Sequence, residues 1–186
     1  MHSTRRTGWS VANGQIDLAI IGGQLPSDLE NLLQIIPYAT DELALVLPSK
    51  HPLSNKKELL KEDLYKLNFV TLDSQSTTRK VVDKLLKDSG LEIQRLKIEM
   101  ELNSLEAIKN AVQSGLGASF LPVVSIEREL AAGTIHIAFI ADLEVKRELK
   151  LITNPSRYTS RASEEFKKNI LPQFASLESP LRQILN

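Results

Sequence analysis

The chain has 186 residues, 42% of them hydrophobic and 5% aromatic, and its 23 lysines and arginines balance 23 aspartates and glutamates. This length suffices for one large domain or two small ones, and the absence of cysteine excludes disulfides, thiolate metal sites and a cysteine nucleophile. A net charge of zero gives the chain as a whole no electrostatic reason to bind DNA, so any DNA binding would belong to another segment.

Apolar runs and turn residues predict alternating helices and strands in the first half of the chain. Residues 7–14 are typical of a short helix that ends at Gly14, and a buried strand follows at 16–21. Two further strands are predicted at 43–48 and 69–73, on either side of a helix at 59–67 with leucines along one face.

The alternation continues in the second half. Helices are predicted at 79–89, 103–114 and 123–132, each followed by a glycine, and strands at 96–102, 118–122, 134–140 and 147–153. Asn103 and Glu106 have the spacing of a capping box, and Pro172 would kink a last helix at 160–177. This pattern is typical of α/β proteins with mainly parallel sheets, here in two sets separated by residues 74–78.

Sequence motifs of known catalytic and metal sites are absent. The three histidines are scattered, and no nucleophile elbow, phosphate-binding glycine loop or dinucleotide fingerprint occurs. We therefore expect no catalytic residue, metal or cofactor. Apolar runs are too short to span a bilayer, and the first residues lack the apolar core of a signal peptide, so a soluble intracellular protein is expected.

Hydroxyl and guanidinium groups gather at the starts of three predicted helices. Helix N-termini favour anions, and arginine can hold a carboxylate or phosphate with two hydrogen bonds. Taken singly, each cluster is also what an ordinary helix cap looks like. Two clusters near a crossing between the two sets together favour an anion site. The clusters are Ser3, Thr4, Arg5, Arg6 and Thr7; Ser74, Ser76, Thr77, Thr78 and Arg79; and Asn103 with Ser104.

Three motifs in the right order resemble the effector-binding domain of LysR-type transcriptional regulators. Residues 11–20 are similar to that family's glycine-x-hydrophobic-Asp pattern, and residues 43–53 to its segment ending in His-Pro-Leu. Residues 112–122 resemble its V-x-x-G-x-G signature ending in Leu-Pro. The segment 2–14 is further similar to the cyanobacterial and plastid branch that regulates RuBisCO and inorganic-carbon genes.

The resemblance implies an α/β fold of two Rossmann-like subdomains with a periplasmic-binding-protein-like (type II) architecture, two crossover strands and a small effector in the cleft. It assigns residues 1–72 plus about 151–186 to the first subdomain and 73–150 to the second. It also implies that the three clusters bind the effector. Small anionic metabolites such as 2-phosphoglycolate, ribulose bisphosphate or 2-oxoglutarate are expected, and Arg5, Arg6 and Arg79 suit them.

Members of this family begin with a winged helix-turn-helix, whereas this sequence begins at what resembles the second strand of the effector domain. DNA binding would therefore need the absent N-terminal part. The resemblance implies a homodimer or homotetramer without membrane association, in the cytoplasm or the plastid stroma. The alternative is a solute-binding protein of a transport system, which shares the architecture. An enzyme comes third, because no nucleophile–base pair or metal site is seen.

Overall fold

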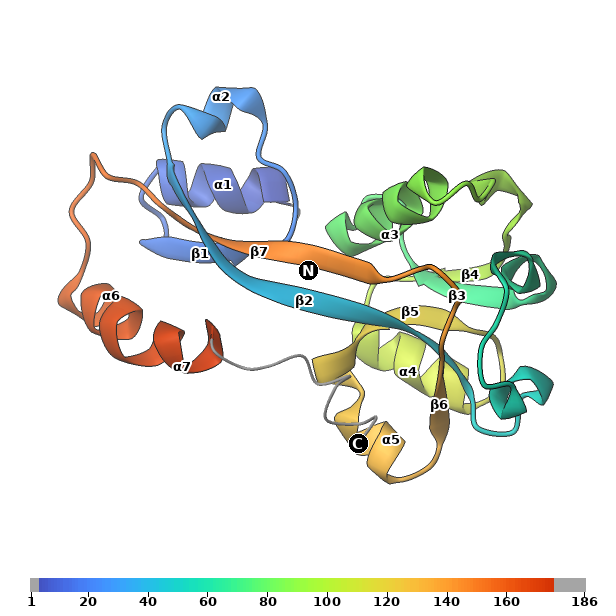
Figure 1. The fold of residues 1–186 in the computed structure, drawn as a ribbon. Helices are drawn as coiled ribbons and strands as arrows, with labels where there is room; N and C mark the ends of the chain where they lie inside the picture. Colours follow the sequence, from blue (N-terminus) through green and yellow to red (C-terminus); the bar gives the residue numbers. More distant parts are fainter. Residues whose placement is uncertain (1–3, 176–186) are drawn as a thin grey trace. The chain divides into compact units, whose positions relative to one another are not determined.

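The computed structural model describes residues 4–175, which form two compact units (Figure 1). Residues Glu42–Lys146 form the central unit, and the described chain before and after them, 4–41 and 147–175, forms the terminal unit. The chain crosses between the units twice, once within strand β2 (Gln34–Pro48) and once within strand β7 (Val145–Thr153).

The boundaries of these units differ from the sequence-based division, which grouped residues 42–72 with the terminal residues. In the structure that segment packs in the central unit. The leucines at the end of β2 and in the turns after it share one apolar core with the helix that follows β3. The core includes Leu43, Leu45, Leu47, Leu59, Leu64, Leu67, Phe69, Val82 and Leu86. The boundary between the two units is therefore set by which apolar side chains are buried together, and not by their position along the chain.

The terminal unit packs two helices, α1 (Thr4–Ala12) and α2 (Ser27–Glu30), against strand β1 (Leu18–Ile21) and the adjoining parts of β2 and β7. Strand β1 pairs antiparallel with β7. The apolar core between the helices and the strands of this unit is formed by Val11, Ala12, Ile21, Leu25, Leu29, Leu33 and Ile152. Glycine at position 14, with a φ of 72°, follows α1 as expected.

Asp17, the aspartate of the glycine-x-hydrophobic-Asp pattern, attaches the C-terminal helix to the start of β1. Its carboxylate accepts hydrogen bonds from the hydroxyls of Ser160 (2.5 Å) and Ser163 (2.7 Å) and from the backbone N–H of Ser160 (3.1 Å). These hydrogen bonds, that of the Ser160 hydroxyl first, lower the pKa of Asp17. The motif residue therefore has a structural partner at the opposite end of the chain.

The C-terminal helix continues through Pro172, where the sequence predicted a kink, but its hydrogen-bonding pattern changes just before the proline. A helix α6 (Arg161–Glu165) continues as a π-helical turn η5 (Phe166–Ile170) and then as α7 (Leu171–Ala175). The proline has no N–H to donate and its ring crowds the carbonyl four residues earlier, so a wider turn just before it relieves the conflict. The Tyr38 hydroxyl donates to the Leu171 carbonyl (3.0 Å), which ties this helix to β2. Residues 176–177 of the predicted helix lie outside the described residues.

The central unit contains two small sets of paired strands with helices around them. Strands β3 (Asn68–Leu72) and β4 (Lys97–Leu102) pair in parallel, and β2 pairs antiparallel with β5 (Ser119–Pro122) and β6 (Ile135–Ala138). The helical elements are η1 (Pro52–Asn55), η2 (Lys61–Lys66), α3 (Thr77–Asp88), η3 (Ile93–Arg95), α4 (Leu105–Gln113), η4 (Val123–Ser125) and α5 (Glu127–Ala131). Figure 1 shows α3 and α4 on opposite faces of the β3–β4 pair.

The prediction of mainly parallel sheets is wrong for the described strands. The pairs β1–β7, β2–β5 and β2–β6 are antiparallel, and β3–β4 is parallel. Two strands joined by a helical crossover run parallel to each other. Strands β2 and β7 instead enter each unit from the other unit, so their pairing with neighbouring strands can be antiparallel. The helix predicted at 59–67 is also shorter in the structure, a 3₁₀ turn over Lys61–Lys66.

Two glycines after α4 are required for different reasons. Gly115 has a φ of 82° and donates to the Val112 carbonyl (2.9 Å), which closes the helix in the left-handed conformation. At Gly117 a Cβ atom would lie 2.6 Å from the backbone oxygen of Asn68. This crowding arises because Ala118, next to it, donates to the same oxygen at 2.7 Å.

These two positions should respond differently to asparagine, which tolerates positive φ but still carries a Cβ. We expect Gly115→Asn to cost less than about 1 kcal/mol of unfolding free energy, and Gly117→Asn to cost about 2 kcal/mol or more, because backbone atoms must move. Urea denaturation of both variants measures the difference. Equal losses at the two positions would contradict the close approach of Gly117 to β3.

An ion pair lies on the terminal-unit side of both crossings. Asp41, 7% exposed, accepts from Nε (2.8 Å) and Nη2 (2.6 Å) of Arg147. On the central-unit side, Lys146 pairs with Glu42 at 3.2 Å. Each unit therefore has its own ion pair at the residues where β2 and β7 enter it.

We expect Arg147→Met to lower the free energy of unfolding by about 3 kcal/mol, because it leaves the buried Asp41 carboxylate without its guanidinium. Lys150→Met is the matched control. It removes a partly exposed pair with Glu148 (3.4 Å) and should cost less than about 1 kcal/mol. Thermal and urea unfolding provide the measurement, and similar costs for the two variants would argue against a structural role for the buried pair.

Asp63 gives the central unit a pH-dependent contribution to stability. Its carboxylate accepts from Lys66 (2.7 Å), Lys56 (3.1 Å) and the backbone N–H of Leu60 (3.2 Å). The hydrogen bonds from Lys66 and then Lys56 lower the pKa of Asp63 from 3.8 to about 2. A carboxylate with a lowered pKa stabilises the fold above its unfolded pKa and loses that effect as the pH falls through its folded pKa.

The stabilisation by Asp63 should therefore be complete above about pH 5 and disappear between about pH 4 and pH 2. Its size should be about 1 kcal/mol, because both lysine partners are largely exposed to solvent. Unfolding free energies measured against pH for the protein and for Asp63→Asn should converge toward pH 2. Parallel curves over that range would contradict the assignment.

Candidate functional site

The parallel pairing of β3 and β4 brings the starts of two helices together within the central unit. Leu72 lies opposite Leu102 at the carboxyl ends of the strands, and the Asp73 N–H donates to the Leu102 carbonyl (3.0 Å). Helices α3 and α4 begin a few residues after these ends. In α/β folds, ligands bind beyond the carboxyl ends of parallel strands. This edge is therefore the expected position of a ligand site in the central unit.

The turn that leads into α3 is closed by hydrogen bonds of Asp73. Its carboxylate accepts from the Gln75 N–H (2.9 Å), and its carbonyl accepts from the Ser76 N–H (2.9 Å). Ser76 is the N-cap and Ser74 is exposed. The helix begins at Thr77, two residues before the predicted start, because its amides continue the turn set by Asp73.

The candidate residues of this cluster therefore differ in accessibility. Thr77 and Thr78 belong to the first helical turn instead of the preceding loop. Thr78 is 4% exposed, whereas Ser76 and Thr77 are half-buried. The hydroxyls at the surface of the turn are those of Ser74, Ser76 and Thr77.

The start of α4 differs from the predicted capping box. Ser104, which is half-buried, is the N-cap residue, and the exposed Asn103 precedes it. The Ser104 side chain makes no capping hydrogen bond. Glu106, expected to complete the box, instead pairs with Lys109 at 2.8 Å. With Ser104 as the N-cap, Glu106 is the second residue of the helix, one position short of the third residue that a capping box uses.

Lys109 supports α4 from inside the central unit. Its side chain is 8% exposed, and its ammonium contacts Glu106 (2.8 Å), Glu129 (2.9 Å) and the Ser125 carbonyl (3.1 Å). The hydrogen bond to Glu106, supported by Glu129, raises the pKa of Lys109 despite its burial. This lysine joins α4 to η4 and α5. A lysine on a helical pattern gave no signal of such a role in the sequence.

The first cluster belongs to the terminal unit. In the described residues helix α1 starts at Thr4, so Thr4 to Thr7 lie within the helix, whereas the sequence placed them before it. Thr4 is buried and Arg5 and Arg6 are exposed. Arg5 lies 3.6 Å from Asp28 in an exposed ion pair. Ser3 lies outside the described residues. The structure thus unites the second and third clusters in one unit and places the first in the other.

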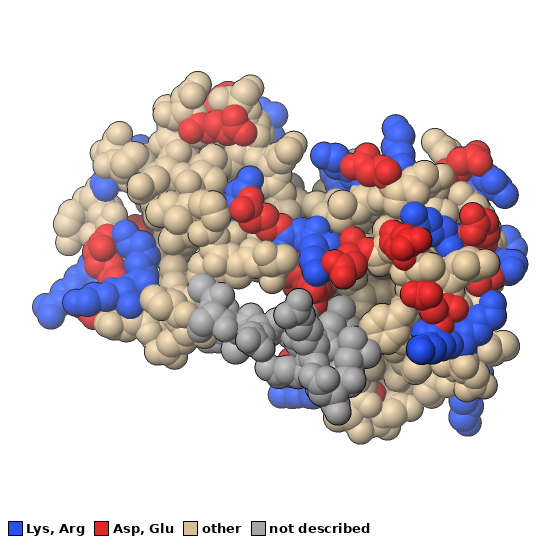
Figure 2. All heavy atoms as spheres, in the orientation of Figure 1, with Lys and Arg blue, Asp and Glu red and all other residues tan. Residues whose placement is uncertain are grey.

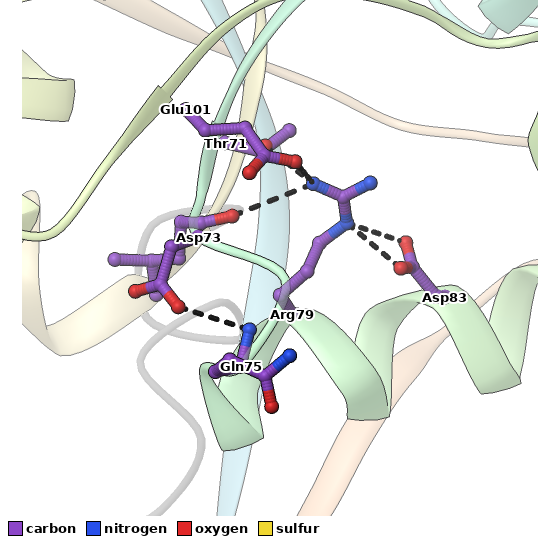
Figure 3. Close-up of polar contacts among 7 residues, drawn as sticks. Thr71, Asp73, Gln75, Arg79, Asp83 and Glu101 are labelled. Carbon is purple, nitrogen blue, oxygen red and sulfur yellow. Dashed lines mark hydrogen bonds and ion pairs between the residues drawn. The ribbon is translucent and has the colours of Figure 1, made fainter. Parts of the chain in front are cut away.

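Arg79 is the candidate whose surroundings differ most from the expectation of an open anion ligand. Its side chain is 11% exposed, and Nε lies 2.8 Å from both carboxylate oxygens of Asp83 (Figure 3). Around the turn, the carboxylates of Asp73, Asp83 and Glu101 accompany the cations of Arg79 and Lys80. Figure 2 shows acidic and basic side chains interspersed on the face drawn.

Two further findings concern the described residues. No group of three or more His, Asp or Glu residues among them is arranged to hold a metal ion. None of the helices in this part of the chain is long and apolar enough to cross a membrane.

The family model described as the LysR substrate binding domain matches residues 2–175, and the chain belongs to this family. Similar curated proteins include the "Probable RuBisCO transcriptional regulator" of Synechocystis sp., 58% identical over 176 residues, and that of Trichormus variabilis, 60% identical over 176 residues. These matches cover 95% of this chain but 51% and 52% of the two relatives. The chain thus spans about half the length of the curated relatives it matches.

Solved structures share the fold. The CcmR regulatory domain of Synechocystis PCC6803, in complex with 2-PG, matches with a TM-score of 0.79 at 22% identity, over 94% of this chain and 81% of that one. The effector binding domain of QuiR, in complex with shikimate, matches with a TM-score of 0.75 at 22% identity, over 94% and 78%. These likenesses confirm the predicted α/β fold of the periplasmic-binding-protein-like (type II) class.

Proposed function

We propose that this effector-binding domain senses a small anionic metabolite and thereby controls RuBisCO or inorganic-carbon uptake genes. The gene targets are suggested by relatives about 60% identical that carry the name RuBisCO transcriptional regulator. The observation that supports the site is the convergence of the starts of α3 and α4 at the carboxyl ends of β3 and β4.

The two helix starts would supply the anion with hydrogen-bond donors and with the positive ends of two helix dipoles. The hydroxyls of Ser74, Ser76, Thr77 and Ser104 and the amide of Asn103 lie at this edge and are at least partly accessible. Among the other candidates, Ser3, Thr4, Arg5 and Arg6 belong to the proposal through the family resemblance.

The first metabolites to test are 2-phosphoglycolate, ribulose bisphosphate and 2-oxoglutarate. The 2-PG in the CcmR structure supports starting with 2-phosphoglycolate. Such a ligand shifts an equilibrium between two conformations only by its difference in affinity for them. The proposed output is a change of geometry in a homodimer or homotetramer, with DNA bound by a winged helix-turn-helix outside these residues, in the cytoplasm or the plastid stroma.

A solute-binding protein for transport would have the same architecture. The curated relatives cited above are named as transcriptional regulators, which favours the regulator.

Isothermal titration of the full-length protein with the three anions tests the proposal. We expect at least one to bind, and Ser104→Ala to weaken it about tenfold, the effect of losing one hydrogen bond to a charged group. Ser114→Ala is the matched control, since this exposed serine caps the other end of α4. Binding of none of the anions, or equal losses for both serines, would contradict the site.

A further inference from the structure

The guanidinium of Arg79 contacts residues of β3, of β4 and of its own helix α3 (Figure 3). Nη1 donates to the Thr71 hydroxyl of β3 (2.5 Å) and reaches the Leu72 carbonyl (3.4 Å). The same nitrogen lies 3.4 Å from Glu101 of β4. Nε donates to Asp83 one turn along α3, with 2.8 Å to each oxygen. One side chain thus joins α3 to both strands of the parallel pair.

We propose that Arg79 is a positioning residue for the effector site and does not itself bind the anion. It fixes the first turn of α3 against the carboxyl ends of β3 and β4, so that the donors of the α3 and α4 starts face the same ligand. This inference rests on the function proposed above and assigns a role within that site.

The charge around Arg79 argues against direct anion binding. Two carboxylates, those of Asp83 and Glu101, already contact the guanidinium, and the side chain is 11% exposed. An incoming anion would have to compete with Asp83 for Nε and with Thr71 for Nη1. It would also approach two negative charges within reach of the same group, which lowers the electrostatic gain.

The contacts suit a positioning role because they fix the first turn of α3, whereas Val82 and Leu86, which join the apolar core with Phe69, lie further along the helix. The Asp73 turn is held on the strand side by its N–H to Leu102 (3.0 Å) and on the helix side by Ser76 (2.9 Å). Arg79 adds a side-chain connection on the outside of the same turn. A planar guanidinium can satisfy Asp83 and Thr71 together, whereas a lysine ammonium cannot span both in that geometry.

Amide hydrogen exchange without any ligand tests the positioning directly. We expect Arg79→Lys and Asp83→Asn each to speed exchange of the Asp73 and Gln75 amides about tenfold relative to core amides of β2. Asp63→Asn is the matched control, an identical chemical change at another ion pair of the central unit. It should affect overall stability and leave these two amides unchanged relative to the core. Unchanged exchange in both Arg79→Lys and Asp83→Asn would overturn the proposal.

Anion titration of the full-length protein with the same variants separates positioning from binding. Asp83→Asn removes a negative charge from Arg79, so a direct ligand would bind the anion more tightly in this variant. A positioning residue predicts the opposite, about tenfold weaker binding, with Arg79→Lys similarly weakened although its charge is kept. Tighter binding in Asp83→Asn would overturn the proposal.

The two proposals fail separately. Failure of the unmodified protein to bind 2-phosphoglycolate, ribulose bisphosphate and 2-oxoglutarate would count against the anion site. The exchange experiment would still decide whether Arg79 sets the turn, because it contains no ligand.

Discussion

The parallel register of β3 and β4 is the constraint on which the candidate site depends. The register shifts once, so that Val70 lies opposite Met100 after Phe69 lies opposite Ile98, and the strands then end level at Leu72 and Leu102. Without this shift, Leu72 would lie opposite Glu101 and the Asp73 amide would be out of line with the carbonyl that accepts its hydrogen bond. One extra residue in β4 therefore aligns the starts of α3 and α4.

The balanced charge of the chain has an internal use in both units. Arg79, Lys109 and Arg147 are each largely buried and paired with carboxylates, so they connect elements and contribute little to the surface field. Such pairs give specific geometry, because breaking one leaves a buried charge uncompensated. Fewer cations at the described helix starts are therefore available to bind an anion than the sequence suggests. Hydroxyl and backbone N–H donors become the main candidates.

Local patterns predicted most elements, and their errors have local causes. Glycines 14, 90, 115 and 133 all adopt positive φ just beyond predicted helices, since a residue without Cβ reaches that conformation without strain. The strand predicted at 96–102 forms at Lys97–Leu102, but its burial departs from the alternating pattern at Met100, which is 41% exposed and lies beside the register shift. Asn103 was expected as a cap, but Glu106, the residue meant to support it, pairs with Lys109.

The sequence by itself determined the class of fold and indicated the helix starts that we propose as an anion site, because turn chemistry, apolar periodicity and family motifs are local properties. It placed Ser76, Thr77 and Ser104 near helix starts, which is where they are. Tertiary structure decided which of these starts meet, where the two units divide, and that Arg79 is occupied by Asp83, Thr71 and Glu101. The i,i+4 spacing to Asp83 was readable, but the contacts with β3 and β4 arise only when parallel pairing brings distant residues together.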